Sequence, residues 1–191
     1  MTDDTLSIRR YLDRLRTLLS ELDEREIAVI AKVLKDAYEE QRTIFVLGNG
    51  GSAATASHLA GDLNKGACLA AEKKFRVHAL TDCQPWILAI ANDLDYDSIF
   101  VEQLKNFAAS GDVVLAFSGS GNSENVLRGI RYAKELGCIT IGVVGYDGGR
   151  LKPMVDYCFH ARVDDMQLTE DAHMVFVHVL LKLLHAGEGS C

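Results

Sequence analysis

The sequence predicts an α/β protein built on a parallel β-sheet, and three observations support this class. From residue 43 onward, short apolar runs alternate with longer segments of helical periodicity. The runs are continuously apolar, which is typical of strands that helices cover on both faces. Such alternation implies parallel strands joined by right-handed crossovers. A chain of 191 residues with 48% hydrophobic content is long enough for one domain with a substantial core.

The elements follow in order along the chain. The first forty residues are predicted to be helical, and Leu12, Leu15 and Leu19 belong to an apolar stripe at helical spacing. Such a leading helix packs either against another subunit or back onto its own sheet, and the sequence leaves both open. Strands are then expected at 43–47, 75–80, 113–117, 139–144 and 157–161. Helices are expected at about 52–65, 85–92, 97–108, 123–136 and 168–185, followed by a disordered tail at 187–191.

Composition excludes several classes of function. The net charge of −7 argues against a broad nucleic-acid surface, which needs a basic face. The five cysteines show no paired CxxC spacing, as in a cytoplasmic protein with reduced thiols. The acidic start of the chain has no apolar signal core, and no apolar run approaches the roughly 20 residues that span a bilayer. We therefore expect a cytoplasmic protein that binds neither nucleic acid nor membrane.

Two turns rich in glycine and serine follow predicted strands. The segment 48–52 (GNGGS) comes after the first strand, and the segment 118–123 (SGSGNS) comes after the third. A turn between a strand and a helix directs free backbone N–H groups and the positive end of the helix dipole at one point. Glycines let a ligand approach the backbone, and serines add hydroxyl donors. The pair of turns predicts a site for a phosphorylated ligand, although ordinary βα turns also favour these residues.

Two nucleotide-binding motifs were considered for these turns. The first turn departs from the dinucleotide-binding GxGxxG spacing because Ala53 stands at the third glycine position. The next acidic residue after the second strand is Asp82, some 30 residues on, where that motif places one at about 20. Neither turn is followed by the lysine of a Walker phosphate loop. We therefore expect no nucleotide cofactor.

Several strings, taken together, resemble a known family. They are residues 48–54 (GNGGSAA), His58, 91–93 (AND), 118–126 (SGSGNSENV), 145–150 (GYDGGR) and 170–173 (EDAH) with His178. The chain resembles the sugar isomerase (SIS) domain family over nearly its whole length, and within it the phosphoheptose isomerases. The resemblance implies a flavodoxin-like three-layer αβα sandwich with a five-stranded parallel sheet. It also implies an N-terminal helical hairpin for oligomerisation at 1–40, the SIS domain at 41–186, and a homotetramer with active sites between subunits.

The resemblance further implies an activity and a set of site residues. The activity is conversion of sedoheptulose 7-phosphate to D-glycero-D-manno-heptose 7-phosphate, for heptose-containing surface polysaccharide in lipopolysaccharide or capsule. Phosphate would lie on the serine turns, and the sugar would lie against the first turn and an Asn-Asp pair; the substrate-binding set is Asn49, Gly50, Gly51, Ser52, Asn92, Asp93, Ser118, Gly119, Ser120, Ser123 and Glu170. The acid/base pair would be Asp62 and His178. One zinc ion per subunit would be held by His58, Asp62, Glu170 and His178.

The chain departs from the family pattern at three of these positions. The family commonly has Glu where Asp62 stands, Gln where Glu170 stands and Thr where Gly119 stands. These differences keep open another sugar phosphate as substrate, including an amino sugar, or a non-catalytic phosphosugar-binding or tetrameric scaffold protein. His58 and Asp62, four residues apart, should share one helix face and suit a metal ion.

The last predicted helix raises a geometric question about its own candidates. Glu170 and His178 are eight residues apart, roughly 12 Å along an ideal helix, so one straight helix should not bring both to one ion. Either Glu170 precedes the helix, or the two residues act from different subunits. Asp171 is a rival for the role of Glu170, while His173 is interpreted as structural. No convincing partner is evident for His160 or the remaining histidines.

Overall fold

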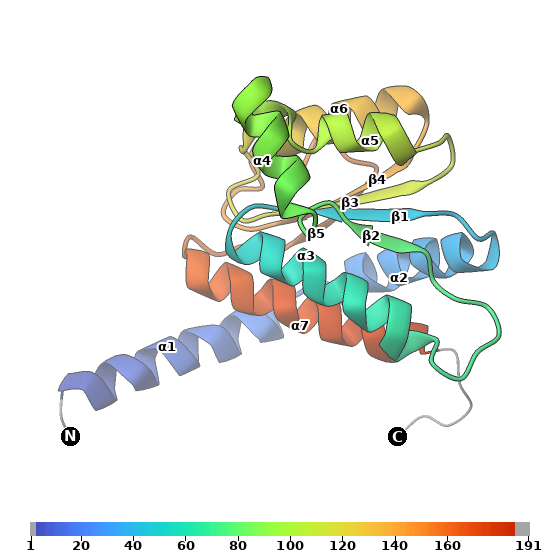
Figure 1. The fold of residues 1–191 in the computed structure, drawn as a ribbon. Coiled ribbons are helices and arrows are strands. Elements are labelled where there is room, and N and C mark those ends of the chain that lie inside the picture. Colours follow the sequence, from blue (N-terminus) through green and yellow to red (C-terminus); the bar gives the residue numbers. More distant parts are fainter. Residues whose placement is uncertain (1–2, 186–191) are drawn as a thin grey trace.

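The computed structural model describes residues 3–185 and has a five-stranded, all-parallel sheet at its centre (Figure 1). The strand order is β2-β1-β3-β4-β5. The strands are β1 (Ile44–Leu47), β2 (Val77–Ala79), β3 (Val113–Ser118), β4 (Ile139–Val144) and β5 (Tyr157–His160). The predicted parallel sheet is confirmed, with β2 shorter than expected. The predicted tail at 187–191 lies outside the described residues.

The helices follow the predicted alternation with two local differences. They are α1 (Asp3–Ser20), α2 (Glu24–Glu39), α3 (Gly51–Gly61), α4 (Gln84–Asp93), α5 (Val101–Phe107), α6 (Glu124–Leu136) and α7 (Met166–Leu184). The helix expected at 97–108 is divided into a 3₁₀ turn, η2 (Tyr96–Ser98), and α5. The helix expected at 52–65 changes after Gly61 into a π-helix, η1 (Asp62–Ala67). Wide turns of this kind occur often at functional sites.

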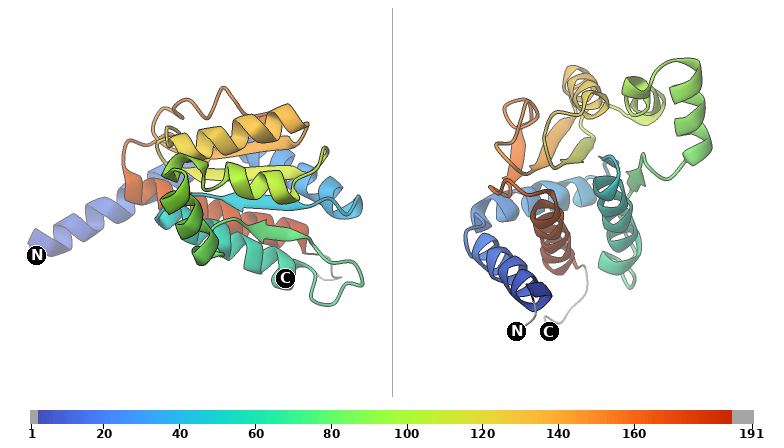
Figure 2. Two further views of the ribbon diagram at one scale, coloured as in Figure 1. Left: turned by 45° about the horizontal axis from the view of Figure 1, so that its top comes forward. Right: turned by 90° about the vertical axis from the view of Figure 1, so that its left-hand side faces the viewer.

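Side chains that alternate along each strand build a three-layer sandwich. Ile44 and Val46 of β1 pack with α2, α3 and α7 on one face of the sheet. Phe45 and Leu47 pack with α4, α5 and α6 on the other face. Figure 2 shows the two helical layers on opposite sides of the strands. The predicted αβα sandwich is therefore confirmed, with a separate apolar cluster on each side of the sheet.

The first helix projects from the body of the molecule (Figure 1). Its apolar stripe divides into two faces: Leu18 is buried and Leu15 packs against the core, whereas Ile8 and Leu12 are 61% and 52% exposed. Leu19, which was expected in the same stripe, is half-buried. The sequence left two destinations open for this helix, and the structure uses one face of α1 for its own core. Among residues 3–185, nothing covers the exposed face of this helix.

The strand order places both glycine-serine turns beside each other. From β1 the chain crosses to β2 on one side and later returns to β3 on the other side of β1. The carboxyl ends of β1 and β3 therefore flank a topological switch point, where open α/β sheets bind their ligands. No helix in the described range is long and apolar enough to cross a membrane. The four cysteines in that range are unpaired.

Candidate functional site

The four serines of the two turns line one pocket at the switch point. Its volume is about 270 Å³. It is lined by Asn49, Gly50, Gly51, Ser52, Phe117, Ser118, Gly119, Ser120, Ser123, Met166 and Glu170. The structure thus brings together nine of the predicted substrate-binding residues and adds Phe117 and Met166. A larger cavity of about 650 Å³ adjoins it but shares only Ser120 with the predicted set.

The first turn leaves the start of α3 open toward the pocket. Gly50 precedes the helix with a φ of 56°, a left-handed conformation that glycine adopts without strain. No side chain caps α3, whereas Asp165 accepts a hydrogen bond from the backbone N–H of Leu168 at the start of α7. The first backbone N–H groups of α3 therefore remain available to a ligand.

The second turn has the same design. Ser118 ends β3 and is buried, and Ser123 stands directly before α6 without capping it through its hydroxyl. Ser120 is half-buried, and its hydroxyl accepts a 3.3 Å hydrogen bond from the backbone N–H of Asn122. Hydroxyl groups and uncapped helix N–H groups thus face one cavity from two sides, an arrangement suited to a phosphate group.

A pair of asparagines joins the two turns. The Nδ2 of Asn49 donates to Oδ1 of Asn125 over 2.9 Å, and the Nδ2 of Asn125 donates back to Oδ1 of Asn49 over 3.0 Å. The Tyr96 hydroxyl also donates to Oδ1 of Asn49, over 3.0 Å. The sequence analysis assigned no role to Asn125 or Tyr96. Asn125 lies inside the motif at 118–126, and this position was the only sign in the sequence that it belongs near the site. Tyr96 lies in a turn whose position is known only from the fold.

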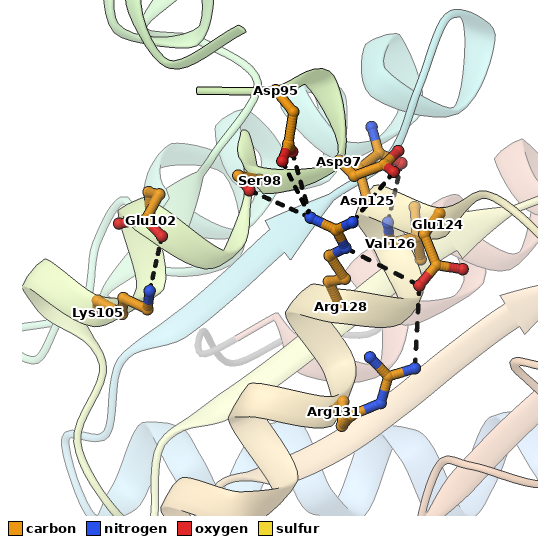
Figure 3. A network of polar contacts seen from close by, with 10 residues as sticks. All are labelled: Asp95, Asp97, Ser98, Glu102, Lys105, Glu124, Asn125, Val126, Arg128 and Arg131. Atoms are coloured by element: carbon orange, nitrogen blue, oxygen red, sulfur yellow. Dashed lines mark hydrogen bonds and ion pairs between the residues drawn. The ribbon is translucent and has the colours of Figure 1, made fainter. Parts of the chain in front are cut away.

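Arginine contacts hold that turn against α6 (Figure 3). Arg128 of α6 reaches the carboxylates of Asp95 and Asp97 at 3.2 and 3.4 Å, and the Ser98 hydroxyl at 3.3 Å. In Figure 3 the same guanidinium also reaches back to Glu124, at 3.9 Å. This network fixes the η2 turn, from which Tyr96 reaches Asn49 at the edge of the pocket.

Glu170 and Asp171 point to different neighbours. Both belong to α7, which excludes the first of the two alternatives, that Glu170 precedes the helix. The Glu170 carboxylate lies directly over Gly51, where a Cβ would collide with it. Asp171 instead accepts a 2.6 Å hydrogen bond from the Tyr11 hydroxyl of α1. That bond raises the pKa of Tyr11 to about 12. Asp171 therefore anchors α1, while Glu170 borders the pocket.

A second cluster lies farther along α3 and α7. The Nε2 atoms of His58 and His178 are 3.3 Å apart, and His58 Nε2 lies 3.2 Å from Oδ2 of Asp62. The three potential ligand atoms lie within 4.8 Å of one another. Oδ2 of Asp62 is shielded from solvent, and apart from this close approach of His58 it has no hydrogen-bond partner among the described residues. The group can hold a metal ion. Glu170, the fourth expected ligand, is not part of it.

Other predicted residues lie elsewhere. Asn92 and Asp93 end α4, are exposed and hydrogen-bond each other over 2.8 Å, and they do not line the pocket of the single chain. His173 is buried, as expected for a structural residue. The expectation that His160 lacks partners is wrong, because its ring nitrogens lie 3.1 Å from Lys152 Nζ and 2.9 Å from the Tyr146 carbonyl oxygen.

Comparison with known proteins identifies relatives of the whole chain. The family model described as the SIS domain matches residues 10–145. A probable phosphoheptose isomerase of Thermoplasma acidophilum is 35% identical over 179 residues, covering 94% of this chain and 98% of the relative. The phosphoheptose isomerase of Geobacter sulfurreducens is 37% identical over 185 residues, covering 96% and 97%. The structure of a phosphoheptose isomerase from Francisella tularensis matches with a TM-score of 0.89 at 25% identity, covering 98% and 100%.

Proposed function

This chain belongs to the SIS domain family and its relatives are phosphoheptose isomerases, so we propose that it has one active site with two ends. The pocket is one end, and the histidine cluster is the other. The reaction is an aldose–ketose isomerisation of a sugar phosphate, with sedoheptulose 7-phosphate as the ketose. The observation that carries the assignment of the site is the meeting of two uncapped helix starts and four serines in one pocket. The phosphate would lie there.

The parallel course of α3 and α7 supports a site with two ends. Both helices start at the carboxyl edge of the sheet and lie side by side (Figure 1). Gly51 meets Glu170 near these starts, and His58 meets His178 farther along. Seven residues separate Gly51 from His58, about 10 Å along a helix. A sugar phosphate in its open-chain form can extend from the phosphate end to the cluster.

The cluster supplies groups for the proton transfers. In the proposed step, the Asp62 carboxylate takes a proton from C1 of the ketose, giving an enediol, and returns it to C2 to give the aldose. His178 moves the accompanying proton between the two oxygens of the enediol. His58 Nε2 lies 3.2 Å from the Asp62 carboxylate, at the end of the proposed site where the reacting carbons would lie. No net oxidation or loss of atoms occurs, because protons only change places.

The same three residues fit a zinc ion. Two nitrogen ligands of tetrahedral zinc, each at about 2.0–2.1 Å, lie about 3.3 Å apart. His58 and His178 have this separation, and the unpartnered Asp62 oxygen offers the third ligand. Zinc bound here would take over the role of His178 by polarising the sugar carbonyl and stabilising the negative charge of the enediolate, and the second oxygen of Asp62 would remain as the base. We assign zinc to these three residues, without Glu170.

Assembly into a tetramer is part of the proposal. The exposed Ile8 and Leu12 on the projecting helix form an apolar face suited to contact with another subunit. Asn92 and Asp93 lie outside the pocket of the single chain, so a neighbouring copy is the means by which they would reach substrate. A site completed by a second subunit would make activity depend on assembly.

Paired substitutions test the two ends separately. Asp62→Asn keeps the shape of the side chain and should reduce turnover on the order of a hundredfold or more, with phosphate affinity nearly unchanged. Ser120→Ala should instead weaken substrate binding severalfold, with a small effect on turnover. Conversion of sedoheptulose 7-phosphate is followed by NMR, and binding of inorganic phosphate by calorimetry.

The matched control is Ser110→Ala, which removes an exposed hydroxyl just before β3, at the opposite end of this strand from the second turn. It should leave both measurements unchanged. Wild-type turnover in Asp62→Asn would remove this carboxylate from the mechanism. Phosphate binding without turnover in the wild-type protein, with or without added zinc, would instead indicate a non-catalytic phosphosugar-binding protein.

A further inference from the structure

Asn125 is a buried polar residue that the proposed mechanism does not use. It is 1% exposed at the start of α6, and it does not line the pocket. Its Oδ1 accepts hydrogen bonds from the backbone N–H of Val126 over 2.8 Å and from Nδ2 of Asn49 over 2.9 Å. Its Nδ2 donates to Oδ1 of Asn49 over 3.0 Å. The polar atoms of this side chain are thus directed at one backbone group and at one pocket residue.

One backbone group sets the orientation of both amides. A backbone N–H can only donate, so the Asn125 atom that faces Val126 must be the oxygen, a contact drawn in Figure 3. The amide nitrogen of Asn125 therefore faces Asn49. Because that nitrogen can only donate, the Asn49 atom 3.0 Å away must be an oxygen. The Tyr96 hydroxyl donates to the same oxygen, also over 3.0 Å. A flipped Asn49 amide would lose both hydrogen bonds to Asn125.

The fixed orientation decides what Asn49 offers to a ligand. Its oxygen already accepts hydrogen bonds from Asn125 and Tyr96, which fills both of its acceptor positions. Its nitrogen carries two hydrogens, and one of them is used in the hydrogen bond to Asn125. The second hydrogen has no acceptor within residues 3–185, and Asn49 lines the pocket. Asn49 can therefore only donate to a ligand, which suits an oxygen of a phosphate or of a sugar hydroxyl.

The two partners of Asn49 are themselves held in place. Asn125 belongs to α6, the helix whose start faces the pocket without a side-chain cap. Tyr96 belongs to the η2 turn, and Arg128 of α6 holds that turn through its acidic residues at 3.2 and 3.4 Å (Figure 3). Both supports of the Asn49 oxygen therefore depend on α6.

We infer that Asn125 and Tyr96 are positioning residues, which hold the Asn49 amide with its free N–H available to the ligand. This inference rests on the proposed function, because it requires a sugar phosphate to bind in this pocket. Neither residue lines the pocket, and each acts through the oxygen of Asn49. Without them the amide of Asn49 can rotate and turn its oxygen toward the anion, which weakens binding.

Double-mutant cycles separate this role from a merely structural one. Asn49→Ala should raise the apparent Kd of sedoheptulose 7-phosphate, measured by calorimetry, about tenfold through the loss of one hydrogen bond to the ligand. Asn125→Ala and Tyr96→Phe should each raise it about threefold or more. In the Asn49→Ala background the same two changes should each alter the Kd by less than about twofold, because the group through which they act is gone. Since Tyr96 is 56% exposed, Tyr96→Phe should fold and carries the test if Asn125→Ala does not.

Two matched controls remove similar groups outside the site. Asn106→Ala removes an amide that donates to the carbonyl oxygen of Glu102 in α5 over 3.1 Å. Tyr132→Phe removes a hydroxyl from the second half of α6. Neither Asn106 nor Tyr132 lines the pocket, so both variants should keep the wild-type Kd. Urea unfolding measures the stability of each variant separately from its Kd.

Two results would overturn the inference while the proposed function stands. One is an unchanged Kd in both Asn125→Ala and Tyr96→Phe. The other is an equal rise of the Kd with and without Asn49, which would indicate a structural role or a direct contact with the ligand. An unchanged Kd in Asn49→Ala also removes the inference, and weakened binding in Ser120→Ala would then keep the pocket as the phosphate site. A wild-type protein that does not bind the sugar phosphate contradicts the proposed function, and the inference with it.

Discussion

Lowering the pH from 7 to 5 should destabilise the fold by about 2 kcal/mol through His173 alone. The ring of this residue is 1% exposed and lies 6.1 Å from the ring of Phe117 and 6.3 Å from that of Phe159, between centroids. Burial lowers its pKa from 6.5 to about 4. In the folded protein the ring therefore stays neutral at pH 5, whereas in the unfolded chain it takes up a proton.

The difference between the pKa of His173 in the folded and unfolded states sets the sign and size of the change in stability. The unfolded state binds more protons than the folded state at every pH between the two pKa values, so stability falls as pH falls. Each pH unit in that interval is worth 1.36 kcal/mol, and about 1.5 units of it lie above pH 5, which gives about 2 kcal/mol. The stabilisation is fully present above pH 6.5 and decreases as the pH approaches 4.

Urea unfolding at fixed protein concentration measures the effect. With an m-value of about 2 kcal/mol per molar, the midpoint for the wild-type protein should fall by about 1 M more between pH 7 and 5 than the midpoint for His173→Leu. Comparing how the midpoint changes with pH in the two proteins removes the contributions of groups that both contain. One of these is His160, because burial also lowers its pKa. An equal change of the urea midpoint between pH 7 and 5 in His173→Leu and the wild-type protein would refute the reasoning.

Three further outcomes are expected. Removing metal with a chelator should reduce turnover on the order of a hundredfold, and added zinc should restore it; full activity in metal-free protein, verified by atomic absorption, would exclude a catalytic zinc. Tyr11→Phe should lower the free energy of unfolding by about 1 kcal/mol, and combining it with Asp171→Ala should cost less than the sum of the two single variants, because both remove one 2.6 Å hydrogen bond. Leu12→Asp should reduce the mass measured by light scattering from that of a tetramer, and an unchanged mass would place the interface elsewhere.

The sheet could be predicted from the sequence because its strands are strongly patterned. The segment 113–117 is buried throughout, so its continuous apolar run predicts a strand covered on both faces. The structure extends this strand by Ser118 alone. The segment 75–80 contains Arg76 and His78, and only Val77–Ala79 forms β2 at the edge of the sheet. The division of 97–108 into a turn and a helix was not evident, since Arg128 holds the turn through contacts more than 25 residues away in sequence.

The parts of the candidate site that depend on local backbone geometry could be predicted from the sequence. The parts that depend on side-chain contacts between distant segments could not. The serine turns follow from strand, glycine and helix start, which are local features, and the fold brings them together at the switch point. The i,i+4 pair of His58 and Asp62 was equally local. Tyr96 and Asn125 contact Asn49 of the pocket through tertiary hydrogen bonds, and no spacing in the sequence indicates such contacts.

Glu170 and His178 lie at different ends of the contact between α3 and α7. Eight residues of one helix separate them, and α3 runs beside that helix in the same direction. Contacts between parallel helices repeat at similar steps, so Gly51 and His58 of α3 meet Glu170 and His178 of α7 in the same order. Glycine at 51 lets a carboxylate approach the phosphate end, while imidazoles at 58 and 178 converge at the other end. One packing register therefore places the Glu170 carboxylate and a group that can hold a metal ion at opposite ends of the proposed site.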